Sequence, residues 1–229
     1  MENWSPKGYL RDQVAIVDGS TGLERTFGDY YESTRRIAGA LKDDLGINEA
    51  STVALFSPNH VDYLPISLAV SLTGAKLAPI NPLYTSAEVA TILDASRSSV
   101  CITHASRLDT ALEAVKSSKT VKHVVIITDN EDDPVPEGTI SLALLKNFGS
   151  PMDETIRLVH ESDDSHPYLL PYSSGTTGHP KGVMLTHENI VVNLLQLEEV
   201  EDLAFPSVRL VVHYKSLMCT CLEFFFLSH

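Results

Sequence analysis

Short apolar runs recur along this chain, and the segments between them carry the spacing of amphipathic helices. The run Thr52–Phe56 is almost entirely apolar, which is typical of a strand buried on both faces of a parallel sheet. Similar runs lie at Lys76–Pro79, Val100–Thr103 and Val121–Thr128. Strands that alternate with helices predict an α/β fold, in which a mostly parallel sheet is covered by helices.

Local signals indicate where several helices begin. Thr26 and Asp29 have the spacing of a capping box, and so do Thr85 and Glu88. The second box predicts a helix that ends at about Ser96. Other elements are expected as follows: a strand at Val14–Gly19, a helix capped by Asn59 that carries Leu64, Leu68 and Leu72, a helix through Leu108, Leu112 and Val115, a short helix at Ser141–Lys146 and a helix capped by Thr186.

A polar cluster interrupts this pattern between the apolar runs Tyr168–Tyr172 and Gly182–Thr186. The flanking runs predict two buried strands, with the cluster as the loop that joins them. Glycine lets the backbone approach a ligand, hydroxyls donate hydrogen bonds, and a lysine supplies a charge for phosphate. The candidate phosphate-binding residues are Ser173, Ser174, Gly175, Thr176, Thr177, Gly178 and Lys181.

Two common nucleotide-binding motifs are excluded by the spacing. Lys181 lies between Pro180 and Gly182, whereas Walker A requires Gly-Lys followed by Ser or Thr. No predicted strand is followed by G-x-G-x-x-G, so a dinucleotide-binding fold gains no support. An ordinary Ser/Gly turn between strands is the alternative to a phosphate-binding loop.

The segment Ser173–Gly178, followed by Pro180–Val183, resembles the phosphate-binding signature of the adenylate-forming (AMP-binding) superfamily. Its members include acyl-CoA synthetases, 4-coumarate-CoA ligases, beetle luciferases and the adenylation domains of peptide synthetases. The flanking segments Leu170–Tyr172 and Met184–His187 are most similar to the 4-coumarate-CoA ligase and luciferase-like branch. The resemblance extends back through the chain, so we interpret residues 1–202 as a partial N-terminal adenylation domain.

The resemblance implies an acid–thiol ligase that uses ATP. In such enzymes a carboxylate and ATP give an acyl-adenylate and pyrophosphate, and a thiol, usually that of coenzyme A, then accepts the acyl group. The family pattern implies that Ser173–Gly178 hold the β- and γ-phosphates. Lys181, the candidate catalytic residue, adds positive charge to the departing pyrophosphate. Mg²⁺ would enter with ATP, and the expected partner is a small carboxylic acid.

From Leu203 onward the sequence departs from the family pattern. Residues 203–229 include Phe224–Phe226, which would form a poor solvent-exposed surface, so we expect a poorly ordered tail. We interpret it as an unselected end, such as altered splicing or a misread gene model produces; a membrane- or partner-binding segment is the alternative. The resemblance places the adenine, ribose and acid sites and the C-terminal lysine beyond this chain, which we expect to be inactive alone.

Three functions stay open at this point. The chain is the N-terminal part of an acid–CoA ligase, a non-catalytic nucleotide-binding or association fragment, or part of a luciferase-like oxygenase. The first and third share the adenylation half-reaction, and the acid pocket that separates them lies outside the sequence.

Composition narrows the class of protein further. The net charge of −13 argues against an extended nucleic-acid surface, which needs a basic face. Acidic residues at 129–137 and 161–164 indicate solvated loops. The nine histidines show no H-E-x-x-H spacing, so no metal ligands are expected among them. Cys101 lies in an apolar run and is expected in the core.

The sequence shows none of the common targeting or membrane-spanning patterns. The start of the chain lacks the pattern of a signal peptide, and no apolar run approaches the roughly 18 residues of a membrane span. These features predict a soluble, cytoplasmic protein with no transmembrane segment. The final residues Leu227–His229 are not a Ser-Lys-Leu type signal, so the chain carries no indication of a peroxisomal address.

Overall fold

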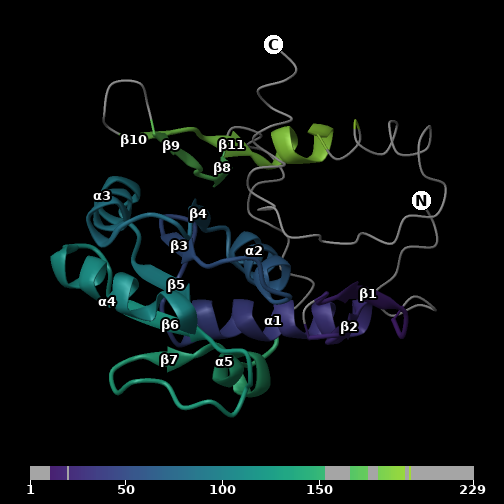
Figure 1. The fold of residues 1–229 in the computed structure, drawn as a ribbon. Helices are drawn as coiled ribbons and strands as arrows, with labels where there is room; N and C mark the ends of the chain where they lie inside the picture. The colour runs from purple at the N-terminus through teal and green to yellow at the C-terminus, as the bar shows by residue number, and fades with distance from the viewer. Residues whose placement is uncertain (1–10, 20, 153–165, 175–179, 194–195, 197–229) are drawn as a thin grey trace.

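The computed structural model describes residues 11–19, 21–152, 166–174, 180–193 and 196. At its centre lies a seven-stranded sheet in the order β11-β8-β4-β3-β5-β6-β7 (Figure 1). Its strands are β3 (Thr52–Phe56), β4 (Lys76–Ile80), β5 (Val100–His104), β6 (His123–Ile127), β7 (Ile140–Ser141), β8 (Pro167–Leu169) and β11 (Leu185–Thr186). Neighbouring strands in this order are parallel, except that β11 is antiparallel to β8. The predicted α/β fold is confirmed.

Helices cover both faces of this sheet (Figure 1). The covering helices are α1 (Phe27–Asp43), α2 (Tyr63–Leu72), α3 (Ser86–Ser96), α4 (Leu108–Ser117) and α5 (Leu142–Phe148). On one face, Leu55 packs in a core that includes Ile37 of α1 and Ile66 of α2. On the other, the next residue of β3, Phe56, packs with Ile92 of α3. Successive side chains of a strand point to opposite faces, so β3 is buried on both sides, as its apolar sequence predicts.

Two antiparallel strand pairs stand apart from the main sheet. The first pairs β1 (Val14–Val17) with β2 (Glu24–Thr26), and it leads directly into α1. The second pairs β9 (Tyr172–Ser174) with β10 (Pro180–Gly182). The strand predicted near Val14 therefore exists, but it pairs with its neighbour along the chain instead of joining the parallel sheet.

Both predicted capping boxes are present. The Thr26 hydroxyl accepts the Asp29 N–H at 3.1 Å, and the Asp29 carboxylate accepts the Thr26 N–H at 2.8 Å. Thr85 and Glu88 make the same reciprocal pair, with the Thr85 N–H donating to Glu88 at 2.8 Å. These backbone hydrogen bonds lower the pKa of both carboxyl groups. Each box satisfies two N–H groups that the first helical turn leaves without partners.

Replacement of Thr85 by alanine is expected to lower the free energy of unfolding by about 1 kcal/mol, the usual loss of an N-cap side chain. Thr91→Ala is the matched control, because Thr91 is exposed on the same helix and its hydroxyl only donates back to the Ala87 carbonyl. Urea unfolding followed by circular dichroism measures both variants. Equal losses would contradict a capping role for Thr85.

The prediction for α2 was wrong in its cap, and the residues that the helix buries differ from the leucines named in the sequence. The helix begins after Asp62, because the Asp62 N–H donates to Nδ1 of His60 and holds the preceding residues in a turn. Leu64 and Leu68 are 42% and 43% exposed. The buried residues of this helix are Pro65, Ile66, Ala69 and Val70. Apolar residues occupy almost every position of α2, so periodicity could not identify the face that packs against α1.

Gly39 lies where the segment after α5 crosses α1. The Met152 N–H donates to the Arg35 carbonyl oxygen at 3.0 Å, and Nε of Arg35 donates to the Met152 carbonyl oxygen at 2.8 Å. A Cβ atom added at Gly39 would overlap the Ser150 carbonyl oxygen. The glycine is therefore required by close backbone approach in the middle of a helix.

Gly39→Ala is expected to destabilise the protein by about 1–3 kcal/mol, the usual range for overpacking. The loss should appear although alanine is the better helix former by about 1 kcal/mol. The control is Gly19→Ala, because a Cβ there meets no atom within 4 Å and the glycine does not have a positive φ. Thermal unfolding measures both; a higher midpoint for Gly39→Ala would show that the segment does not approach the helix this closely.

Candidate functional site

The β9–β10 hairpin carries both ends of the predicted phosphate-binding loop. Its register pairs Ser174 with Pro180, Ser173 with Lys181 and Tyr172 with Gly182. Residues 175–179 connect the two strands in sequence and lie outside the described residues. Strands do lie at both ends of the polar cluster, but they include its own residues Ser173, Ser174, Pro180 and Lys181 instead of beginning and ending outside it.

The hairpin follows β8 and is positioned beside β4 and α3 (Figure 1). The Leu170 N–H donates to the Leu77 carbonyl oxygen of β4 at 2.8 Å. The side chain of Tyr172 packs against the core beneath α3. A Cβ at Gly182 would lie 3.0 Å from the Tyr172 ring, so glycine allows β10 to lie close to that ring. The base of the hairpin is thus anchored to the sheet.

Of the predicted site residues, Ser173 and Ser174 lie on β9, and Lys181 lies on β10 with an exposed side chain. Gly175, Thr176, Thr177 and Gly178 lie outside the described residues. The backbone pairing places Lys181 opposite Ser173, which brings the two ends of the motif together. Phosphate contacts by these residues remain a prediction.

The expectation of a buried strand after the motif was wrong. Val183 is 43% exposed and Met184 is 71% exposed. The reason is the pairing: β10 pairs with β9 outside the main sheet, and β11 lies at the edge of that sheet as the structure describes it. The helix predicted after Thr186 is confirmed, since residues 187–193 are helical and the Thr186 hydroxyl accepts the Asn189 N–H at 3.2 Å.

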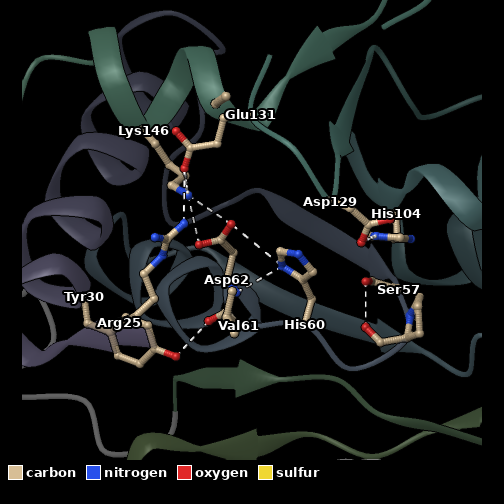
Figure 2. A network of polar contacts seen from close by, with 12 residues as sticks. Arg25, Tyr30, Ser57, His60, Val61, Asp62, His104, Asp129, Glu131 and Lys146 are labelled. Carbon is tan, nitrogen blue, oxygen red and sulfur yellow. Dashed lines mark hydrogen bonds and ion pairs between the residues drawn. The ribbon is translucent and has the colours of Figure 1, made fainter. Parts of the chain in front are cut away.

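A buried ionic network lies at the carboxyl edge of the parallel strands (Figure 2). Nζ of Lys146, on α5, lies 3.1 and 3.0 Å from the two carboxylate oxygens of Asp62 and 2.9 Å from Oε1 of Glu131. The side chains of Lys146 and Asp62 are only 7% and 8% exposed. The network joins α5 to the connection before α2 and to the loop after β6.

Further side chains complete this network. Nη2 of Arg25 lies 3.3 Å from Glu131, and the Tyr30 hydroxyl donates to the Val61 carbonyl oxygen at 2.8 Å (Figure 2). The hydrogen bond from Lys146 lowers the pKa of Glu131, and burial raises the pKa of Tyr30. The loop at 129–138 is mostly exposed, as predicted, but Glu131 is an ion-pair partner rather than a solvated charge.

His60, His104 and Asp129 meet at the same edge, a grouping that sequence spacing did not indicate (Figure 2). His60 follows β3, His104 ends β5, and Asp129 follows β6. Nε2 of His104 lies 3.3 Å from Oδ1 of Asp129. The signal that could have found them is positional, because residues just after parallel strands share one edge of the sheet.

Two smaller expectations can be compared with the structure. Cys101 is fully buried, as predicted, and burial raises the pKa of its thiol to about 12. In the part of the chain that the structure describes, no helix combines the length and apolar character needed to cross a membrane.

Comparison with known proteins defines the class to which this fold and hairpin belong. The red-emitting luciferase from Phrixothrix hirtus has the same fold, with a TM-score of 0.69 and 25% sequence identity, over 80% of this chain and 44% of the luciferase. The chain is also 36% identical over 187 residues to 4-coumarate-CoA ligase 1 of Arabidopsis thaliana, covering 82% of this chain and 33% of that protein. It is 36% identical over 195 residues to 4-coumarate-CoA ligase 1 of Petroselinum crispum, covering 85% and 33%.

The family model for AMP-binding enzymes matches residues 4–228. The chain therefore belongs to the AMP-binding enzyme family, as its motif predicts. It spans about a third of the length of the curated relatives that it matches.

Proposed function

We propose that this chain is the N-terminal part of an ATP-dependent acid–thiol ligase that acts through an acyl-adenylate. The observation that supports this most directly is the register of the β9–β10 hairpin, which pairs Lys181 with Ser173 at the base of the predicted phosphate-binding loop. Membership of the AMP-binding family and identity with 4-coumarate-CoA ligases agree with it. By similarity to those relatives, aromatic carboxylic acids such as 4-coumarate are the first substrates to test.

The proposed reaction has two steps. A carboxylate oxygen of the acid attacks the α-phosphorus of ATP, the bond to the β-phosphate oxygen breaks, and pyrophosphate leaves. The sulfur of coenzyme A then attacks the acyl carbon, and AMP leaves as the thioester forms. The acid needs no general base, because it is already ionised at neutral pH. The protein's contribution is positioning and neutralisation of charge.

In this proposal the residues Ser173–Gly178 donate amide and hydroxyl hydrogens to the β- and γ-phosphates. Lys181, whose side chain is exposed on β10, adds positive charge to the pyrophosphate as it leaves. The described strands of the hairpin contain no carboxylate, so the Mg²⁺ that accompanies ATP would be held by phosphate oxygens and not by β9 or β10.

The test compares this 229-residue chain with a longer protein that carries the same N-terminal part. Each is incubated with ATP, Mg²⁺, coenzyme A and a panel of aryl and fatty acids, and pyrophosphate release is measured. We expect acid-dependent release from the longer protein and none above background from the shorter chain. Release from neither, with or without coenzyme A, would favour a non-catalytic nucleotide-binding or association role instead.

The proposed division into residues 1–202 and 203–229 has its own test. Deletion of 203–229 should leave the solubility and thermal midpoint of the chain unchanged or improved. Precipitation of the shortened chain would show that the tail belongs to the fold.

A luciferase-like oxygenase is the second candidate, favoured by the fold shared with the Phrixothrix hirtus luciferase. Such an enzyme also begins with adenylation, so pyrophosphate release alone does not separate the two. Oxygen consumption and light emission by the longer protein, measured with a luciferin in place of the aryl acids, do separate them. Thioester formation without oxygen uptake would support the ligase.

A further inference from the structure

Three side chains with metal-ligating atoms converge at the carboxyl edge of the sheet, next to the Asp62 end of the ionic network (Figure 2). One ligating atom from each of His60, His104 and Asp129 lies within 4.8 Å of the other two. The two imidazole rings have their centroids 5.6 Å apart and are inclined at 42°. Each residue comes from the end of a different parallel strand, so the group exists only in the folded sheet.

The position of this group matches where open α/β sheets bind ligands. Strand β3 lies between β4 and β5; the connection after β3 leads to β4 on one side, and the connection after β5 leads to β6 on the other. The carboxyl ends of β3 and β5 therefore flank a topological switch point, which is the usual ligand crevice of such sheets. Both strands are buried throughout, so they hold the histidines on a rigid base.

The donor atoms suit a divalent ion of zinc type, which prefers imidazole nitrogen and carboxylate oxygen. Nε2 of His104 and Oδ1 of Asp129 are 3.3 Å apart, close to the ~3.4 Å between two ligands of a tetrahedral Zn²⁺ with bonds of about 2.1 Å. The histidine side chains are 11% and 9% exposed, whereas Asp129 is 74% exposed. The two imidazole ligands are thus buried, whereas the carboxylate ligand is accessible to water.

Local charge also favours a cation. The three carboxylates of Asp62, Glu131 and Asp129 outnumber the cations Lys146 and Arg25 in the surrounding network (Figure 2).

The second ring nitrogen of His104 lies within hydrogen-bond distance of a hydroxyl, and that of His60 lies near a carboxylate. Nδ1 of His104 lies 2.8 Å from the Ser106 hydroxyl, and Nδ1 of His60 lies 3.7 Å from Oδ2 of Asp62. In the structure both Nδ1 atoms accept a backbone N–H, from Ser106 and from Asp62, which leaves the ring proton on Nε2. Metal binding through Nε2 requires that proton to move to Nδ1, which gives up the two backbone hydrogen bonds; on His104 the Ser106 hydroxyl can then accept it.

We propose that His60, His104 and Asp129 form a binding site for a divalent transition-metal ion, with Zn²⁺ as the probe and water at the remaining position. The two imidazoles bind through Nε2 and Asp129 through a carboxylate oxygen. A bound ion would tie together the three connections that follow β3, β5 and β6. The site is separate from the phosphate-binding hairpin and does not depend on the proposed ligase activity.

The test is a nucleotide-free titration of the full 229-residue chain, stripped of metal by a chelator and free of any histidine tag. Calorimetry with Zn²⁺ should give one saturable site, and Co²⁺ should give visible absorption bands with the same stoichiometry. His104→Ala should weaken Zn²⁺ binding by more than about 100-fold, and Ser106→Ala by about 10-fold, within the 10–100-fold range of losses typical of residues behind the ligands.

His123→Ala is the matched control, because His123 opens β6 at the opposite edge of the same sheet, and its Zn²⁺ affinity should equal that of the unmodified chain. Asp129→Asn decides the outcome if His104→Ala does not fold, since Asp129 is exposed and asparagine keeps its size while binding Zn²⁺ weakly. The absence of saturable binding would overturn the proposal. So would equal affinities in the Asp129→Asn and His123→Ala variants, because other histidines would then hold the ion.

Discussion

Replacement of Lys146 by methionine is expected to lower the free energy of unfolding by about 3–5 kcal/mol, the usual loss when one partner of a buried ion pair is removed. Methionine matches the length of the lysine side chain but cannot donate to Asp62 or Glu131. The Asp62 carboxylate, 8% exposed, would then lie buried next to an apolar group and without its cation. Urea unfolding at neutral pH, followed by circular dichroism, measures the loss.

Two further variants separate the ion pair from simple packing. The double variant Asp62→Asn with Lys146→Met should lose less than the lysine variant alone, because it leaves no uncompensated charge. Arg25→Ala should cost less than about 1 kcal/mol, since its contact with Glu131 is partly exposed. A loss below about 1 kcal/mol in Lys146→Met would mean that the network contributes no more than a surface ion pair.

The same network predicts a dependence on acid. The Lys146 hydrogen bond lowers the pKa of Glu131 from its ordinary value of 4.5 in the folded protein. A carboxyl group whose folded pKa is depressed adds stability above its unfolded pKa, and that stability is lost as the pH falls through the folded pKa. The unmodified chain should therefore lose more stability below pH 4.5 than Lys146→Met does.

Local signals in the sequence predicted the elements whose ends are determined by neighbouring residues. The capping boxes at Thr26 and Thr85 are readable because both partners lie within four consecutive residues. Strands β3 and β5 are readable because burial on both faces requires an unbroken apolar run. For these helix starts and buried strands, the residues that determine the structure are all neighbours in the sequence.

Features that depend on partners far along the chain were missed. Packing against α1 determines which residues of α2 are buried. Met184 is exposed because the preceding strand, β10, pairs with β9 and not with the main sheet. Neither partner can be identified from the apolar pattern of the segment itself. From the sequence, Gly39 would only be expected to destabilise its helix. The structure shows that glycine is needed there because the Ser150 carbonyl oxygen lies next to it.

The two candidate sites differ in the same respect: one could be predicted from consecutive residues, and the other could not. The predicted phosphate-binding motif is continuous, so Ser173 and Lys181 could be named from the sequence, and the hairpin register adds that they are paired across the two strands. The group of His60, His104 and Asp129 is assembled from three strand ends, and the order β4-β3-β5-β6 had to be known before they could be placed together. The strand order cannot be inferred from the spacing of these three residues in the sequence.

Lys181→Ala, introduced into a longer protein that carries this N-terminal part, is expected to slow adenylation by a factor of roughly 100–1,000. This corresponds to the ~2.7–4 kcal/mol that a single preorganised interaction with a developing charge typically contributes. The charge on pyrophosphate grows as the bond to the α-phosphorus breaks, so the proposed contact with Lys181 should strengthen in the transition state. The rate should therefore fall far more than the affinity for the acid does.

Two control variants separate the loss of a phosphate contact from a loss of stability and from the loss of a positive charge elsewhere. Thr186→Ala removes a hydroxyl that accepts the Asn189 N–H just beyond the hairpin, and it should cost about 1 kcal/mol of stability with little change in rate. Lys116→Ala removes the same charge from an exposed position on α4 and should leave adenylation unchanged. Pyrophosphate release in single-turnover experiments measures all three. Small and equal effects of Lys181→Ala and Lys116→Ala would indicate that Lys181 only occupies a strand next to a turn, and that the phosphates are bound elsewhere.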